Sequence, residues 1–158
     1  MIEYISELII ALPDEIKIFI LSMIPIFECR GSIPVAILSY EMNPLKSYII
    51  SIVGNIFPIP IIYKGLDIFK KELNKLKLFR KISNSASNKI NKVKIKYKKL
   101  GITVFTAIPL PYTGAWTATL GSNMIGLDSK ETFKYIAVGV SIAGIIITLI
   151  TSSLGSVI

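Results

Sequence analysis

Glu28 and Arg30 are the residues of this sequence best suited to bind a charged group. They lie one residue apart in the stretch Pro25–Pro34, P-I-F-E-C-R-G-S-I-P, which has apolar sequence on both sides. A charge buried in a membrane is costly, so such residues pair, meet water or bind a ligand. The arginine could hold a phosphate or carboxylate, and the carboxylate could carry a proton. The alternative is an ion pair that only holds the local fold.

A second break in the apolar sequence lies at a matching position in the other half of the chain. It runs from Ala107 to Trp116, A-I-P-L-P-Y-T-G-A-W, and carries no charge. We interpret the two breaks as the walls of one site, in which Trp116 either contacts an apolar tail or anchors the chain at the membrane interface. The residues expected to shape or line this site are Pro25, Gly31, Pro34, Asn55, Pro58, Pro109, Pro111, Tyr112, Thr113, Gly114 and Trp116.

The composition of the chain is that of a membrane protein. Of its 158 residues, 52% are hydrophobic and 18% are charged, which is too apolar for a soluble domain of this size. The chain has no histidine and one cysteine, Cys29, which argues against a zinc site and a histidine-dependent triad. We therefore expect no metal, no cofactor and no catalytic residues, and hence no enzyme.

Basic residues are concentrated in the stretch 67–100, whereas most of the charged residues in 1–44 are acidic. A basic run between apolar stretches of membrane length indicates a loop on the cytoplasmic side rather than a nucleic-acid-binding segment. We expect 67–100 to be an amphipathic, helical connector on the cytoplasmic surface of the membrane, with its lysines toward anionic headgroups or toward water.

The elements that position the two breaks are expected to be helices only, in a single membrane domain over 1–158 made of two repeats. The first repeat, 1–66, has an amphipathic lead over 1–15, a broken hairpin over 16–40 and a span over 45–66. The second repeat, 101–158, has a broken hairpin over 102–125 and a span over 132–158. Neither half of the broken segment 16–40 reaches the ~20 apolar residues of a span. A broken segment is thus either one kinked span or a re-entrant hairpin, and the prolines at 25 and 34 favour the hairpin.

With the connector inside the cell, the two hairpins would enter from opposite faces of the membrane and the two repeats would be inverted. Inverted repeats with discontinuous helices are typical of secondary transporters. Small residues mark the helix faces expected to pack closely. They are Ser47, Ser51, Gly54 and Pro58 in the first span, and Ala137, Ser141, Gly144, Thr148, Ser152 and Gly155 in the second.

Three motifs resemble the putative small multidrug export protein family, which is similar to the DedA-like (VTT-domain) membrane proteins. They are Glu28–Pro34, Gly54–Pro58 (G-N-I-F-P) and Ala107–Trp116. In that family the third motif usually reads P-L-P-G-T-G-A-W, and here Tyr112 replaces its first glycine. The resemblance implies paired re-entrant helices and proton-linked movement of lipid headgroups, including polyisoprenyl phosphates. It also implies a role for acidic and arginine residues in the hairpins, which Glu28 and Arg30 match, although the second hairpin has no arginine.

Three functions remain open from the sequence. The first is a transporter in which Arg30 binds an anionic lipid headgroup and Glu28 carries a proton. The second is a proton-coupled exporter of lipophilic cations that bind Glu28. The third is a non-transporting scaffold that docks through the basic connector. The expected partners are membrane lipids and protons, and a homodimer is one assembly compatible with so thin a bundle.

Overall fold

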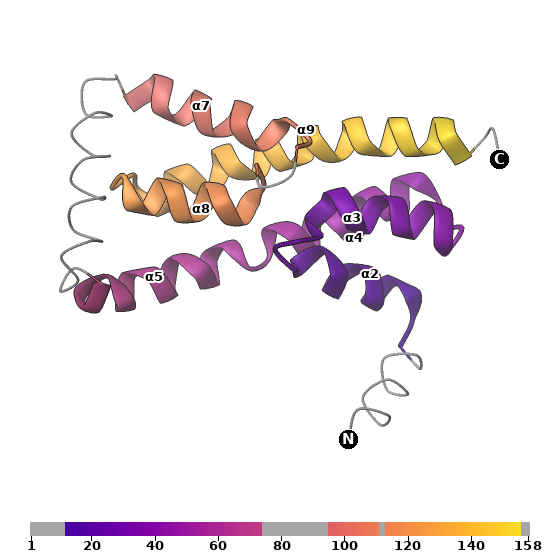
Figure 1. Ribbon diagram of the computed structural model, residues 1–158, viewed down its shortest axis with the longest axis horizontal. Coiled ribbons are helices and arrows are strands. Elements are labelled where there is room, and N and C mark those ends of the chain that lie inside the picture. Colours follow the sequence, from indigo (N-terminus) through magenta and orange to yellow (C-terminus); the bar gives the residue numbers. More distant parts are fainter. Residues whose placement is uncertain (1–11, 74–94, 111–112, 156–158) are drawn as a thin grey trace. The chain divides into compact units, whose positions relative to one another are not determined.

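The chain folds into helices, with no strand in the part that the computed structural model describes, residues 12–73, 95–110 and 113–155 (Figure 1). The helices are α2 (Asp14–Met23), α3 (Glu28–Pro34), the π-helix η1 (Val35–Ser39), α4 (Pro44–Ile56), α5 (Ile59–Leu73), α7 (Ile95–Ala107), α8 (Ala115–Met124) and α9 (Ser129–Gly155). This confirms the all-α prediction. The lead over 1–11, the middle of the connector over 74–94, and the residues Pro111 and Tyr112 lie outside the described ranges.

Two helical stretches are long and apolar enough to cross a membrane, Pro44–Leu66 and Ser129–Gly155. They correspond to the predicted spans 45–66 and 132–158. The helices of the two broken segments are shorter than the ~20 residues that a span needs. The chain therefore has two candidate membrane spans, joined by shorter helices.

The first candidate span is interrupted by a turn at 57–58, between α4 and α5. Pro58 has no N–H to donate to the carbonyl of Gly54, and its ring crowds that carbonyl, so a regular helix cannot continue through it. This turn divides the first candidate span into two helices. α5 then continues to Leu73, and α7 begins at Ile95, so both described ends of the basic connector are continuous with helices of the neighbouring segments.

The chain divides into two compact units that do not coincide with its two halves. Unit 1 contains residues up to Asn55 and those from Gly144 onward, and unit 2 contains Ile56–Ala143. Each unit therefore holds one broken segment together with a part of each candidate span.

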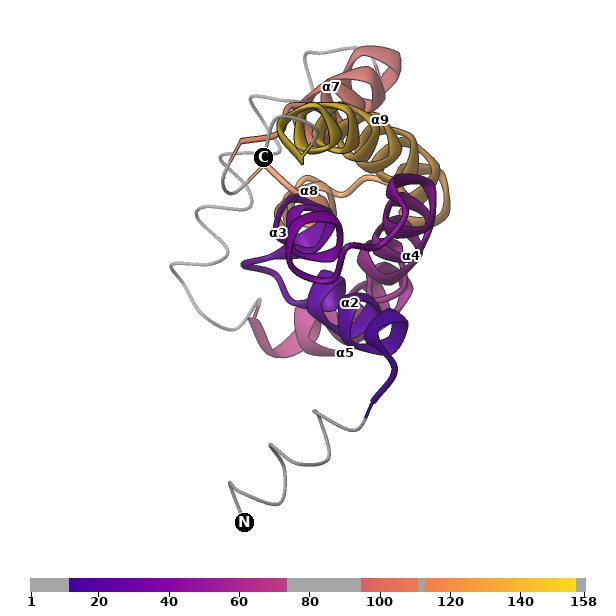
Figure 2. The same ribbon diagram turned by 90° about the vertical axis from the view of Figure 1, so that its right-hand side faces the viewer.

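The broken segment of unit 1 is a helix, a tight turn and a second helix. α2 and α3 pack against each other (Figure 2), and in the turn the N–H groups of Phe27 and Glu28 both donate to the Ile24 carbonyl, at 3.1 and 2.9 Å. Beyond Pro34 the helix widens into η1, in which the Tyr40 N–H donates to the Val35 carbonyl at 3.2 Å. In unit 2, α7 and α8 likewise pack against each other, and residues 108–110 and 113–114 between them are not helical. An interruption in each broken segment is confirmed, but the first is shorter than the predicted Pro25–Pro34 because α3 begins at Glu28. Whether the hairpins re-enter the membrane stays a prediction.

A glycine contact joins α4 to α2 in unit 1. A Cβ atom on Gly54 would lie 1.9 Å from Ser22 Oγ and 2.6 Å from the Phe19 carbonyl oxygen. Ser22 Oγ itself donates to that carbonyl at 2.7 Å. Only a residue without a side chain allows this approach, so Gly54 fixes the distance between the two helices.

Unit 2 contains the same contact, 84 or 85 residues further along the chain. A Cβ atom on Gly139 of α9 would lie 1.8 Å from Thr106 Oγ1 and 2.5 Å from the Thr103 carbonyl oxygen on α7. Thr106 Oγ1 donates to that carbonyl at 3.1 Å, as Ser22 does to its own partner in unit 1.

An ion pair near the start of each candidate span also recurs at this offset. Lys46 of α4 pairs with Glu15 of α2 at 2.5 Å, and Glu131 of α9 pairs with Lys99 of α7. The charges are exchanged between the two units: the span provides the base in unit 1 and the acid in unit 2.

The helix caps repeat as well. The Asn43 side chain accepts the Leu45 N–H at 3.0 Å before α4, and the Asp128 side chain accepts the Glu131 N–H at 2.9 Å before α9. Each cap satisfies a first-turn donor that has no partner within its helix.

Each unit has its own apolar core. In unit 1, Ile18, Ile33 and Ala36 are fully buried, and in unit 2 Ile59, Ile136 and Ala143 are. Many large apolar side chains of the spans are exposed instead, among them Val138 and Leu149 of α9. Exposed apolar surface on this scale suits contact with lipid rather than with water.

Candidate functional site

Glu28 and Arg30 form an ion pair at the beginning of α3. Arg30 Nη1 donates to Glu28 Oε2 at 2.5 Å, and the two side chains are only 15% and 6% exposed. Glu28 has a φ of +48°, which is uncommon for a residue other than glycine and costs energy unless its surroundings enforce it. Residues held in such conformations are frequent at functional sites.

The sequence around the pair accounts for this local structure. Pro25 lies exposed in the turn after α2, and Pro34 ends the regular α-helical part of the segment. A Cβ atom on Gly31 would lie 2.8 Å from Cδ1 of Phe27. The absence of a side chain at Gly31 therefore lets the Phe27 ring lie against α3 just before the ion pair.

Three fully buried polar side chains lie on α3 and α4: Ser32, Ser51 and Asn55. The hydroxyl oxygens of the two serines have no hydrogen-bond partner among the described residues. Asn55 lies beside the thiol of Cys29, which places this face of α4 against α3. Each buried polar group without a partner costs about 1–3 kcal/mol. A polar ligand that reached these groups could satisfy them by hydrogen bonding.

The sequence indicated Asn55 as a site residue but Ser51 only as a packing residue, and it indicated no role for Ser32. Helical spacing is the signal that relates both serines to the predicted site, because Ser32 follows Glu28 by four residues and Ser51 precedes Asn55 by four. Residues four apart share a helix face, so each serine lies on the face of a predicted site residue.

The other predicted site residues belong to unit 2. Pro58 and Gly114 are buried, Trp116 is half-buried and Pro109 is exposed. The Thr113 hydroxyl lies within 2.7 and 2.8 Å of the carbonyls of Ile108 and Leu110, so it holds the turn together. That the two breaks form the walls of one site stays a prediction.

No three His, Cys, Asp or Glu side chains within the described ranges are grouped closely enough to hold a metal ion. The candidate site therefore consists of the Glu28 carboxylate, the Arg30 guanidinium, the hydroxyls of Ser32 and Ser51 and the Asn55 amide. The two charged groups can exchange ion-pair partners, and the others can hydrogen-bond a polar ligand.

Comparison with known proteins gives one match. Residues 28–146 match the family model described as "Putative small multi-drug export protein". The matched region covers more than half of the chain and contains both breaks and most of both candidate spans. No curated protein and no solved structure matches the chain.

Proposed function

Since the chain belongs to the putative small multidrug export protein family, we propose that it is a multi-pass transporter that moves an anionic lipid headgroup, such as a lipid phosphate, coupled to protons. The family description indicates a transporter-like export role in a membrane. The observation that carries the finer proposal is the buried pair between Glu28 and Arg30 at 2.5 Å in a broken helical segment.

In the proposed mechanism the headgroup and Glu28 compete for one guanidinium. While Glu28 is ionised, Arg30 pairs with it and the site is closed to anions. When Glu28 takes up a proton its charge is lost, and Arg30 binds the phosphate through its planar donor groups. The free hydroxyls of Ser32 and Ser51 and the Asn55 amide would then hydrogen-bond the polar guest. Release of the headgroup returns Arg30 to Glu28 and the proton to water.

We also propose that the two broken segments are re-entrant hairpins of an inverted repeat, as in DedA-like proteins, with the basic connector in the cytoplasm. The contacts that recur after 84 or 85 residues support a repeat. The glycine contact, the helix cap and the ion pair each occur once in either unit. The repeat does not extend to the charged pair, because the positions equivalent to Glu28 and Arg30 are Tyr112 and Gly114.

The second candidate function is export of lipophilic cations in exchange for protons, which the words of the family description favour. It requires Glu28 to bind the cation. In the structure its carboxylate is already bonded to Arg30, so a cationic drug would have to displace a tethered guanidinium. This competition makes the anionic cargo the better proposal.

The test is flux in proteoliposomes that contain the full chain. The cargo is a fluorescent polyisoprenyl phosphate, measured with and without a proton gradient. We expect Arg30→Gln to abolish flux and Glu28→Gln to remove its dependence on the gradient. Lys17→Gln serves as the control, because Lys17 forms a more exposed pair with Asp14 in the same unit.

Two results would overturn the proposal. The first is flux in Arg30→Gln equal to that of wild type. The second is transport of a fluorescent lipophilic cation, lost in Glu28→Gln, with no movement of the lipid phosphate; that result would establish the second candidate.

A further inference from the structure

A groove of about 420 Å³ lies between α5 and the beginning of α9 in unit 2. Its lining residues are Pro60, Tyr63, Lys64, Ser129, Lys130 and Phe133. Two rings and a proline form an apolar wall, and two lysines lie on the rim. An apolar wall beside a basic rim is complementary to an amphiphile with a negative headgroup.

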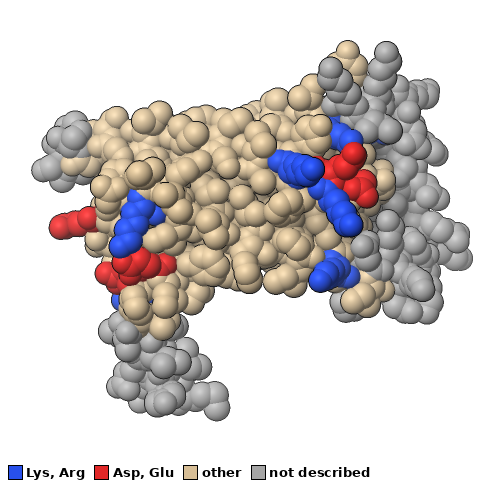
Figure 3. Space-filling model, turned by 180° about the vertical axis from the view of Figure 1, so that it is seen from behind, with Lys and Arg blue, Asp and Glu red and all other residues tan. Residues whose placement is uncertain are grey.

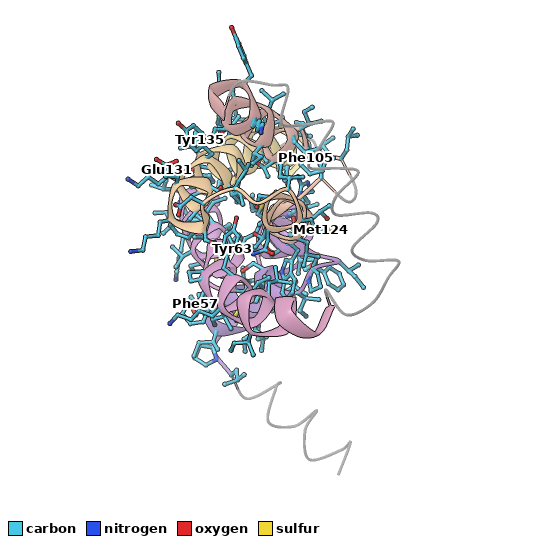
Figure 4. All side chains as sticks on the ribbon, turned by 90° about the vertical axis from the view of Figure 1, so that its left-hand side faces the viewer. Phe57, Tyr63, Phe105, Met124, Glu131 and Tyr135 are labelled. Atoms are coloured by element: carbon cyan, nitrogen blue, oxygen red, sulfur yellow. The ribbon has the colours of Figure 1, made fainter. Side chains whose placement is uncertain are left out.

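The apolar wall is held rigidly. The Tyr63 hydroxyl and Ser122 Oγ of α8 are 2.6 Å apart in a buried hydrogen bond, and Figure 4 shows Tyr63 between α5 and the helices α8 and α9. The tyrosine is only 4% exposed. Its ring is therefore fixed and almost fully covered, so the apolar surface open to a chain comes mainly from Pro60, which is exposed, and Phe133, which is half-buried.

The two lysines on the rim are available to bind an anion. Both Lys64 and Lys130 are exposed, and neither forms an ion pair with any residue that the structure describes. The nearby acid Glu131 is paired with Lys99, and the Asp128 carboxylate caps α9. Figure 3 shows basic side chains gathered on this part of unit 2 with a smaller number of acidic ones among them.

We infer that this groove binds one anionic phospholipid, with its phosphate between Lys64 and Lys130 and an acyl chain along Pro60 and Phe133. A lipid is favoured over a soluble anion because the groove combines charge with an apolar wall and lies on both candidate spans, 44–66 and 129–155. Basic pockets between membrane helices are suited to anionic headgroups.

This lipid is a resident ligand of unit 2, and its binding does not depend on the proposed cargo or on Arg30. A protein that binds it and moves no lipid phosphate would refute the proposed function and leave this inference intact. A protein that moves lipid phosphate but binds no phospholipid in this groove would refute this inference and leave the proposed function intact.

The test is equilibrium binding of fluorescent phosphatidylglycerol and fluorescent phosphatidylcholine to the full chain in neutral detergent. Each lysine near an anionic headgroup contributes about fivefold in affinity. We expect phosphatidylglycerol to bind about tenfold or more tightly than phosphatidylcholine, and Lys64→Gln and Lys130→Gln each to weaken it about fivefold. Lys134→Gln is the matched control, since it removes the same charge from α9 one turn away and outside the groove.

Three results would overturn the inference. Equal binding of the two lipids would remove the role of charge. An equal loss in Lys134→Gln would show that net charge, rather than the groove, attracts the lipid. Displacement of phosphatidylglycerol by its water-soluble headgroup alone, at the same concentration as by the whole lipid, would show a soluble-anion site without a chain groove.

Discussion

Replacing Gly54 or Gly139 with alanine is expected to destabilise the protein, although the same change at a helical glycine with open space around it, such as Gly121, should not. In each of these two positions an added Cβ would lie within 2 Å of a hydroxyl oxygen and within 2.6 Å of a backbone carbonyl oxygen on the neighbouring helix. Both distances are well inside van der Waals contact. The hydroxyl could rotate away, but the carbonyl belongs to a helix and can move only with it.

Two opposing effects set the size of the change. Alanine is favoured over glycine in a helix by up to about 1 kcal/mol. Overpacking a close helix contact costs about 1–3 kcal/mol, and more where backbone must shift. Because the clash at both positions involves backbone, we expect a net loss of about 1–3 kcal/mol for Gly54→Ala and for Gly139→Ala. Each kcal/mol corresponds to about 2–4 °C in melting temperature for a chain of this size.

The assay is thermal unfolding of the purified protein in a mild detergent. Gly121→Ala is the control, because a Cβ on Gly121 within α8 meets no atom within 4 Å. The control should melt at or above the temperature of the wild type. The reasoning would be refuted if Gly54→Ala and Gly139→Ala were as stable as Gly121→Ala, and the case for a repeated contact would fall if only one of the two were affected.

Three further perturbations test other contacts. Arg30→Gln should cost about 3 kcal/mol because it leaves Glu28 charged and buried, and adding Glu28→Gln should restore most of the loss; equal melting temperatures for wild type and the single variant would contradict this. Hydrogen bonding to Lys46 lowers the pKa of Glu15, so this pair stabilises the fold above the ordinary glutamate pKa of about 4.3, and that stability is lost as the pH falls through the lowered pKa. As the pH is lowered from 6 to 3, the melting temperature should therefore fall more steeply in wild type than in Glu15→Gln. Parallel curves for the two proteins would count against this role of the pair. Tyr63→Phe removes one buried hydrogen bond and should cost about 1 kcal/mol in the same melting assay, with a neutral result ruling out a structural role for that bond.

The sequence was sufficient to predict the local features of the fold. Prolines and the polar residues between them predicted breaks at Pro25–Pro34 and Ala107–Trp116. Helices α2 and α7 end just before or at the start of these stretches, but helix resumes at Glu28 within the first. The predicted packing face around Ser51 and Gly54 is buried. These features depend on residues close in the chain, whose spacing can be read directly.

Features that depend on distant residues could not be predicted. The small-residue face predicted for α9 is partly buried: Gly144 lies against Ile52, whereas Ala137 and Ser141 are half-buried. The buried face of α9 also includes Ile136 and Val140, which the prediction did not contain. Residue size alone could not show which face of α9 is buried. The close contact of Gly139 with Thr103 and Thr106 belongs to that face, and it can be recognised only once the position of α7 is known.

The residues of the groove and the two buried serines could not be identified as site residues from the sequence for the same reason. Lys64 and Lys130 are 66 positions apart, and no local pattern indicates that they share a rim. Ser32 and Ser51 are ordinary small residues in apolar sequence. Helical spacing places them on the faces of Glu28 and Asn55, but their lack of hydrogen-bond partners is visible only in the structure.

The central claim is that Glu28 and a headgroup phosphate compete for Arg30, and the most direct test is binding of a polyisoprenyl phosphate to wild type, Glu28→Gln and Arg30→Gln. The affinities are compared at each pH, so that titration of the ligand cancels. The account predicts that Glu28→Gln binds more tightly than wild type at neutral pH, that wild type approaches it as the pH falls, and that Arg30→Gln binds weakly throughout. Binding as weak in Glu28→Gln as in Arg30→Gln would contradict competition and leave the pair with a structural role.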